Sequence, residues 1–203
     1  MPIRLLLLLS FLSVPLLTAA QETRRFSTLS SRWADSFVEW ELYTVPAPDS
    51  TQAADPDAEP PEESMSGEIK LRWLNMREDW TEWEYEYLGE RGTIRRKWKD
   101  DPSYWELRAY NGAIVSMKTA WVNDFSEWRV TDNAINFVFG SRWKNQFDEW
   151  QAKDNNNGAF YLYTLKERDP RDWAIDDQTS AEVSNELKLA MIFLALFYGA
   201  PKQ

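Results

Sequence analysis

Tryptophan recurs at a fixed spacing along this chain and constrains its fold more than any other feature. Five times a tryptophan is followed seven positions later by another, so that ten of the 12 tryptophans belong to such pairs. The pairs are Trp33/Trp40, Trp73/Trp80, Trp98/Trp105, Trp121/Trp128 and Trp143/Trp150. Two positions after each first tryptophan stands Asp or Asn, whose side chain can hydrogen-bond the local backbone and turn the chain. The spacing predicts a structural repeat with a turn between the two tryptophans.

Between the pairs, apolar and polar residues alternate as in half-buried strands. Trp105, Leu107 and Ala109 alternate with polar side chains, and Asn111-Gly112 follows as a strong hairpin signal. Such alternation, with turn residues at regular intervals, predicts an antiparallel sheet in a sandwich or barrel. Both members of each tryptophan pair keep the phase of the buried face, so we expect both rings in the core. The Arg-Trp dipeptides should then place Arg outside and Trp inside.

The end of the chain has a helical pattern instead. Residues 179–182 read as a capping box, and residues 187–198 are apolar on nearly every side after Lys188, up to Gly199. A helix without a polar face must be enclosed by the rest of the protein. We therefore expect a mainly β fold: an antiparallel meander closed into a barrel, or a strongly curved sheet, of about 10–12 strands around a hydrophobic C-terminal helix.

Residues 1–20 have the features of a secretory signal peptide. Arg4 precedes an apolar run over residues 5–17, and small residues follow at 18–20. The apolar run is shorter than the ~20 residues that a membrane span needs. Cysteine is absent, which excludes disulfides and the usual lipoprotein attachment. We expect a secreted protein of the bacterial periplasm or cell surface, with no stable membrane anchor after signal cleavage.

Residues 46–65 differ in composition from the rest of the chain. They hold five of the ten prolines and six acidic residues, with no basic or aromatic residue. Such a segment buries too little apolar surface to offset its ordering entropy, which predicts a disordered acidic loop. The domain then consists of an N-terminal strand region over residues 21–45 and the main β-meander with its helix over residues 66–203.

The composition excludes several classes of function. With neither His nor Cys, the usual zinc sites, Ser-His-Asp triads, Cys-His dyads and haem ligation are ruled out, and no glycine-rich phosphate loop is present. We expect no cofactor. The net charge of −10 argues against binding to nucleic acid.

Carboxylate chemistry is what remains. Glu82, Glu84 and Glu86 share one strand face, where a carboxylate pair among aromatic residues can hydrolyse a glycosidic bond or, alternatively, form a solvated face opposite Arg or Lys. Asp154 with residues 155–157 offers oxygen ligands for Ca²⁺, although turn chemistry explains these residues equally well. A second group with both interpretations is Asp172, Asp176 and Asp177.

Three tyrosines fall on the outward phase and are better placed than the tryptophans to contact a ligand: Tyr104, Tyr110 and Tyr161. Together these features favour an exported, non-enzymatic binding or scaffold protein whose partner is an unidentified envelope ligand or protein. The alternative is a carbohydrate-binding module or a carboxylate-dependent glycosidase of the periplasm or cell surface. The residues leave enzymatic activity open.

The units at residues 104–115 and 125–130, together with the apolar run at 187–198, resemble the Tubby C-terminal-like group with its LURP-one-related and scramblase relatives. The resemblance covers about residues 33–199. It implies a closed barrel of about a dozen strands around a hydrophobic C-terminal helix. Tubby-type proteins bind phosphoinositide headgroups through Lys and Arg on the barrel surface. None of those residues carries over, because the basic cluster at residues 91–99 is flanked by Glu90, Asp100 and Asp101.

Overall fold

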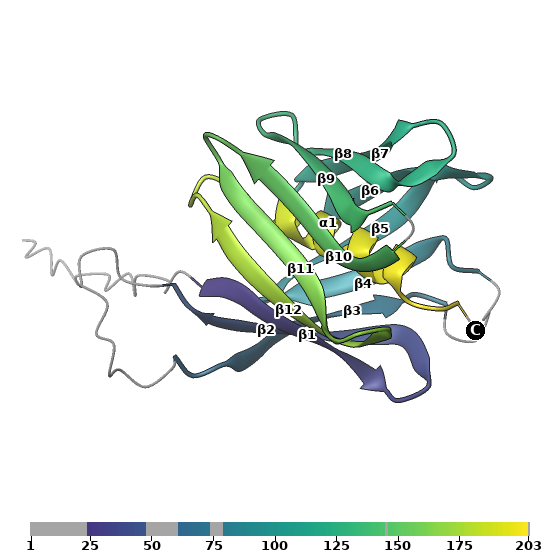
Figure 1. Ribbon diagram of the computed structural model, residues 1–203. Helices are drawn as coiled ribbons and strands as arrows, with labels where there is room; N and C mark the ends of the chain where they lie inside the picture. Colours follow the sequence, from purple (N-terminus) through teal and green to yellow (C-terminus); the bar gives the residue numbers. More distant parts are fainter. Residues whose placement is uncertain (1–23, 48–60, 74–78, 145, 203) are drawn as a thin grey trace, which may run out of the picture.

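The computed structural model describes residues 24–47, 61–73, 79–144 and 146–202, which form twelve strands and one helix (Figure 1). The elements in chain order are β1 (Arg24–Trp33), β2 (Ser36–Pro46), β3 (Ser64–Leu71), β4 (Glu82–Tyr87), β5 (Glu90–Trp98), β6 (Asp101–Ala109), β7 (Ile114–Trp121), β8 (Asp124–Thr131), β9 (Asn136–Trp143), β10 (Gln146–Asp154), β11 (Gly158–Lys166), β12 (Asp169–Thr179) and α1 (Asn185–Gly199). Each strand pairs antiparallel with its sequence neighbours, and β1 pairs with β12, so the sheet closes into a barrel. The predicted mainly β, closed antiparallel meander is confirmed.

Helix α1 fills the barrel (Figure 1). All eleven side chains from Leu187 to Phe197 are buried, because the strands surround the helix on every side. The Phe193 ring packs edge-on against Trp83 and Trp105, with centroids 5.7 and 4.9 Å apart. Each such apolar side chain contributes roughly 1.5–3 kcal/mol by leaving water. The predicted enclosed helix is thus confirmed. At 15 residues it does not meet the length and hydropathy expected of a bilayer-crossing helix.

The predicted start of the helix is wrong. Ser184 is the N-cap, and its Oγ accepts from the backbone N–H of Leu187 at 3.2 Å. Thr179, the expected cap, is instead the last residue of β12. Its hydroxyl and its backbone N–H donate to the Asp177 carboxylate at 2.6 and 3.1 Å. A local acceptor two residues earlier therefore holds Thr179 in the strand.

A bulge recurs where an odd-numbered strand turns into the next even-numbered strand. In the first hairpin Ser31 pairs with Trp40 and Trp33 with Ser36, so one residue of β1 faces three of β2. The same shift occurs in the β5/β6, β7/β8, β9/β10 and β11/β12 hairpins. A bulge bends its strand and increases the local twist.

The two tryptophans of a pair do not share the core, contrary to the prediction. The first members are exposed: Trp33 (51%), Trp73 (45%), Trp98 (63%), Trp121 (65%) and Trp143 (53%). The second members Trp40, Trp105, Trp128 and Trp150 are at most 1% exposed, while Trp80 is half-buried. Each first member lies beyond the bulge or, for Trp73, beyond the end of β3. Alternation of faces cannot be extended through a bulge, since the added twist turns the next residue out of phase.

The buried tryptophans form a more regular series than the seven-residue pairs. Six of them sit on the even-numbered strands: Trp40, Trp83, Trp105, Trp128, Trp150 and Trp173. In five of the six, the indole N–H donates to the backbone carbonyl three residues earlier, at 2.8–3.1 Å. The predicted repeat did not include Trp83 and Trp173, because neither has a tryptophan seven positions earlier.

Parts of the predicted domain scheme lie outside the described residues, namely the signal segment 1–20 and residues 48–60 of the acidic loop. The ends of that loop belong to strands instead, because Pro46 closes β2 and Ser64 opens β3. The Glu63 carboxylate accepts hydrogen bonds from the hydroxyls of Ser27 and Thr28 at 2.5 and 2.8 Å. This contact ties the returning chain to β1.

Candidate functional site

Exposed tryptophans gather at one end of the barrel. Strands alternate in direction, so every turn from an odd-numbered to an even-numbered strand lies at the same end. The tryptophan rim consists of the five first members: Trp33, Trp73, Trp98, Trp121 and Trp143. Val122 (89% exposed) and Leu165 add apolar surface beside it. Large exposed apolar side chains concentrated in one region mark a candidate interaction surface.

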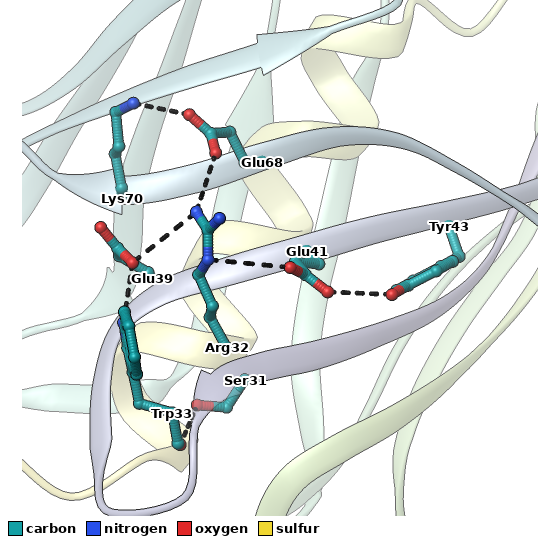
Figure 2. A network of polar contacts seen from close by, with 8 residues as sticks. All are labelled: Ser31, Arg32, Trp33, Glu39, Glu41, Tyr43, Glu68 and Lys70. Carbon is teal, nitrogen blue, oxygen red and sulfur yellow. Dashed lines mark hydrogen bonds and ion pairs between the residues drawn. The ribbon is translucent and has the colours of Figure 1, made fainter.

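Three of the rim tryptophans donate their indole N–H groups to glutamates on the outer wall. The indole Nε1 of Trp33 donates to Glu39 Oε2 at 2.7 Å, as Figure 2 shows. The indoles of Trp73 and Trp121 donate to Glu82 and Glu127, each at 3.1 Å. Because the polar edge of each ring is already satisfied, what it offers to solvent is its apolar face.

The rim glutamates belong to wider ion-pair networks. Figure 2 shows the Arg32 guanidinium beside the carboxylates of Glu39, Glu41 and Glu68, at 3.9, 3.9 and 3.7 Å. Lys70 donates to Glu68 at 2.6 Å, and this hydrogen bond raises the pKa of the Lys70 ammonium. Exposed ion pairs contribute only about 0–1 kcal/mol each, so their main effect is to fix the positions of the side chains.

The Arg-Trp dipeptides do not divide into an outer Arg and an inner Trp as predicted. The Arg72 guanidinium lies 5.1 Å from the centroid of the Trp73 ring, and that of Arg142 lies 5.4 Å from the Trp143 ring. Both partners sit on the outside, because Trp143 lies beyond a bulge and Trp73 lies beyond the end of β3. Such contacts contribute roughly 0.5–1 kcal/mol at exposed sites and cover part of each ring.

A groove lies on the outer face of β10, β11 and β12 and reaches Arg142 at the end of β9. Its volume is about 750 Å³, within the roughly 300–1,000 Å³ of small-molecule sites. Tyr161 lies in the middle strand, opposite Gln151 of β10 and Asp176 of β12. We call this the outer groove. It combines aromatic rings with amide, carboxylate and cationic side chains on three paired strands.

The three tyrosines predicted to contact a ligand do not come together. Tyr161 lines the outer groove. Tyr110 is 72% exposed, but it follows β6 at the end of the barrel opposite the rim. Tyr104 is half-buried near the rim end of β6, with the Lys97 ammonium 5.9 Å from its ring centroid. Sequence reasoning missed Tyr163 of the groove, which is 45% exposed and has the same outward phase as Tyr161.

The carboxylates that were candidates for catalysis are paired with bases on the outer wall. Glu82 and Glu84 lie 2.5 and 3.2 Å from the Arg72 guanidinium. Glu86 pairs with Arg91 at 2.8 Å. This arrangement is the solvated, base-opposed face that the sequence left as the alternative to a catalytic pair.

The calcium candidates serve other contacts. Asp154 Oδ1 accepts from the backbone N–H groups of Asn156 and Asn157 at 2.9 and 2.8 Å, and these bonds lower the pKa of its carboxyl group. Asp172 accepts from Ser30 at 2.8 Å. Within the described ranges, no three acidic side chains are grouped so that they could hold a metal ion. Turn and strand contacts therefore account for these aspartates.

A buried polar cluster near the start of α1 was not predicted. Lys188 Nζ lies 2.9 Å from Asp177 Oδ2, and the two side chains are 8% and 0% exposed. The hydroxyls of Tyr85 and Tyr87 are also buried, with no hydrogen-bond partner in the described part of the chain. Burial raises the pKa of both hydroxyls, that of Tyr87 to about 12. Lys188, a charged residue in an apolar helix, was the available signal.

Comparison with known proteins finds no match: neither a family model, nor a curated protein, nor a solved structure is similar to this chain.

Proposed function

We propose that this chain is an exported, non-enzymatic binding protein that meets its ligand on the outside of a filled barrel. The proposal rests on the opposite burial of the two tryptophans of a pair. One indole of each of four pairs is buried at 1% exposure or less, whereas its partner stands in water with more than half of its surface exposed. Exposing a large apolar ring to water is unfavourable in free energy. A series of such rings at one end of the barrel therefore favours a binding role.

Contacts on the outer wall favour binding over catalysis. The carboxylates on β4 that a glycosidase mechanism would need each have a guanidinium within 3.2 Å. In a glycosidase two carboxyl groups flank the scissile bond, whereas each of these three is engaged by an arginine on the outer wall. The carbohydrate-binding alternative needs only aromatic rings in water, which both the rim and the outer groove offer.

Export to the periplasm or cell surface is part of the proposal and rests on residues 1–20 and on the absence of cysteine. The relationship to the Tubby-like group remains a prediction. The twelve-stranded barrel is compatible with it, but the phosphoinositide-binding bases of that group have no counterparts in the sequence.

Sedimentation with envelope fragments of the producing cell tests the binding role. We expect the mature protein to pellet with the fragments and the Trp98→Ala/Trp121→Ala variant to remain largely in the supernatant. Both indoles are more than 60% exposed, so the variant should stay folded and melt within a few degrees of the parent. Equal pelleting of both proteins would remove the rim from the proposal, and no pelleting of either would refute envelope binding.

A further inference from the structure

The outer groove contains a tyrosine that stands between two rows of paired residues. Glu149, Tyr163 and Ala174 lie opposite one another across β10, β11 and β12. In the same way Lys153 pairs with Ala159, which pairs with Gln178. Tyr161 stands between these rows on β11. Its neighbours on the same face of β11 are Ala159 on one side and Tyr163 on the other.

The polar groups around Tyr161 are suited to hydroxyl groups. The amide of Gln178 donates to Asp176 at 2.7 Å, which leaves the other carboxylate oxygen free to accept. Within the described chain, neither the Gln151 amide nor the Tyr161 hydroxyl makes a side-chain hydrogen bond. Carboxylates and amides facing an open groove offer the acceptors and donors that a polyhydroxylated ligand needs.

The charges in the groove balance. Arg142 pairs with Glu149 at 3.0 Å, and the Lys153 ammonium lies 5.3 Å from the centroid of the Tyr161 ring. Asp176 is the remaining carboxylate of the lining. A strongly anionic ligand would meet Glu149, Asp176 and the net negative charge of the chain. A strongly cationic ligand would have to displace Arg142 or Lys153 from these contacts.

We infer that the outer groove is a binding site for a neutral oligosaccharide, with Tyr161 and Tyr163 stacking on the apolar faces of sugar rings and Gln151 and Asp176 hydrogen-bonding their hydroxyls. This assignment rests on the proposed binding function and names the ligand class and the residues. A groove of about 750 Å³ that is open to solvent suits a short stretch of a longer chain. The exposed ring of Trp143, next to Arg142, extends the aromatic surface toward the rim.

Affinity electrophoresis of the mature protein in native gels tests the assignment. The probes are soluble neutral polysaccharides (hydroxyethylcellulose, glucomannan and starch) and anionic polygalacturonate. We expect retardation by at least one neutral polymer and none by polygalacturonate. Tyr161→Ala should bind about tenfold more weakly, which is the effect of losing one aromatic contact of roughly 1.4 kcal/mol. Tyr161→Phe, which keeps the ring, should bind as the parent does or nearly so.

Two further variants keep the test decisive. Tyr163→Ala changes a side chain that is 45% exposed, so it should fold normally even if Tyr161→Ala is unstable, and it should also weaken retardation. Tyr110→Ala removes an exposed aromatic ring that lies outside both the outer groove and the tryptophan rim, and it should have no effect on retardation. Retardation that survives Tyr161→Ala and Tyr163→Ala, or that Tyr110→Ala abolishes, would overturn the assignment to the groove.

The same proteins separate this inference from the function on which it rests. If they pellet with envelope fragments but no neutral polysaccharide retards them, the groove assignment fails and the binding function stands. If retardation is strongest with polygalacturonate, the neutral-ligand assignment fails. If neither pelleting nor retardation occurs, both proposals fail together.

Discussion

The hydroxyl of Tyr198 occupies, beside Trp105, the place that a backbone carbonyl takes in the other five units. It accepts from the Trp105 indole N–H at 3.4 Å and donates to the Pro102 carbonyl at 3.0 Å. Elsewhere the buried indole bonds directly to the carbonyl three residues earlier. The last turn of α1 is therefore hydrogen-bonded into the repeat of the barrel wall at one position.

Tyr198→Phe should remove this bridge while keeping the aromatic packing. The ring stacks on Phe125 at 5.2 Å and would stay in place, so only the two hydrogen bonds are lost. We expect the free energy of unfolding to fall by about 1–2 kcal/mol in urea titrations. Tyr110→Phe, which alters a 72%-exposed residue, is the matched control and should change nothing. Equal stability of Tyr198→Phe and the parent would show that the bridge contributes no net stability.

Replacing each member of one tryptophan pair should give very different losses of stability. Trp128 is fully buried and Trp121 is 65% exposed. Trp128→Ala should lower the free energy of unfolding by about 3–5 kcal/mol because it opens a cavity in the core. Trp121→Ala should cost no more than about 1 kcal/mol, since it loses one exposed hydrogen bond to Glu127. Similar losses of stability for the two variants would indicate that the first tryptophan of the pair is buried in the core.

The sequence predicted the parts of this fold that depend on local periodicity. Trp105, Leu107 and Ala109 are buried as their alternation predicted, and the Asn111-Gly112 turn joins β6 to β7. The bulges could not be predicted in the same way. A seven-residue spacing fits a regular hairpin, with both rings inside, as well as a bulged one with a single ring inside. The pairing register between the strands decides whether the regular or the bulged hairpin is formed.

The candidate site was predictable only in part. The outward position of Tyr161 follows from strand phase. Its neighbours Gln151 and Asp176 come from two other strands, and their alignment depends on the lengths of the intervening turns. The rim was missed because the alternation was carried across the bulges. The pairing of Lys188 with Asp177 joins α1 to β12, and the periodicity of neither element predicts it.

Fluorescence quenching by acrylamide should resolve two populations of tryptophan. Six rings are at most 3% exposed, and five are at least 45% exposed. We expect a Stern–Volmer plot that curves downward, with one fraction readily quenched and another nearly inaccessible. Removing rim residues by Trp98→Ala/Trp121→Ala should shrink the accessible fraction alone. Uniform quenching of the native protein would contradict the division into buried and exposed tryptophans.

Breaking the ion pair inside the barrel should destabilise the protein far more than breaking a surface pair. Lys188→Met leaves the fully buried Asp177 carboxylate without its cation, which should cost about 3–5 kcal/mol. Arg91→Met, which breaks the exposed pair with Glu86, should cost about 0–1 kcal/mol. In Lys188→Met/Asp177→Asn both charges are gone and the Thr179 hydroxyl keeps an acceptor, so much of the loss should be recovered. Urea unfolding of the single and double variants measures the coupling directly.

Alkaline pH should unfold the protein through its buried tyrosines. Burial raises the pKa of Tyr85, and it raises the pKa values of Tyr87 and Tyr198 to about 12 each, whereas an unfolded tyrosine ionises near pH 10. Above pH 10 the unfolded chain loses protons that the folded chain keeps. Stability is therefore fully present below pH 10 and falls as the pH rises toward 12, by up to about 1.4 kcal/mol per pH unit for each group.

Tyr87→Phe isolates one of these groups. Its hydroxyl has no hydrogen-bond partner among the described residues, so the substitution should leave stability at pH 8 unchanged or slightly higher. It should also make the decline between pH 10 and 11 shallower than in the parent, when urea midpoints are followed together with phenolate absorbance. An identical decline in the two proteins would mean that this hydroxyl ionises in the folded barrel as it does in the unfolded chain.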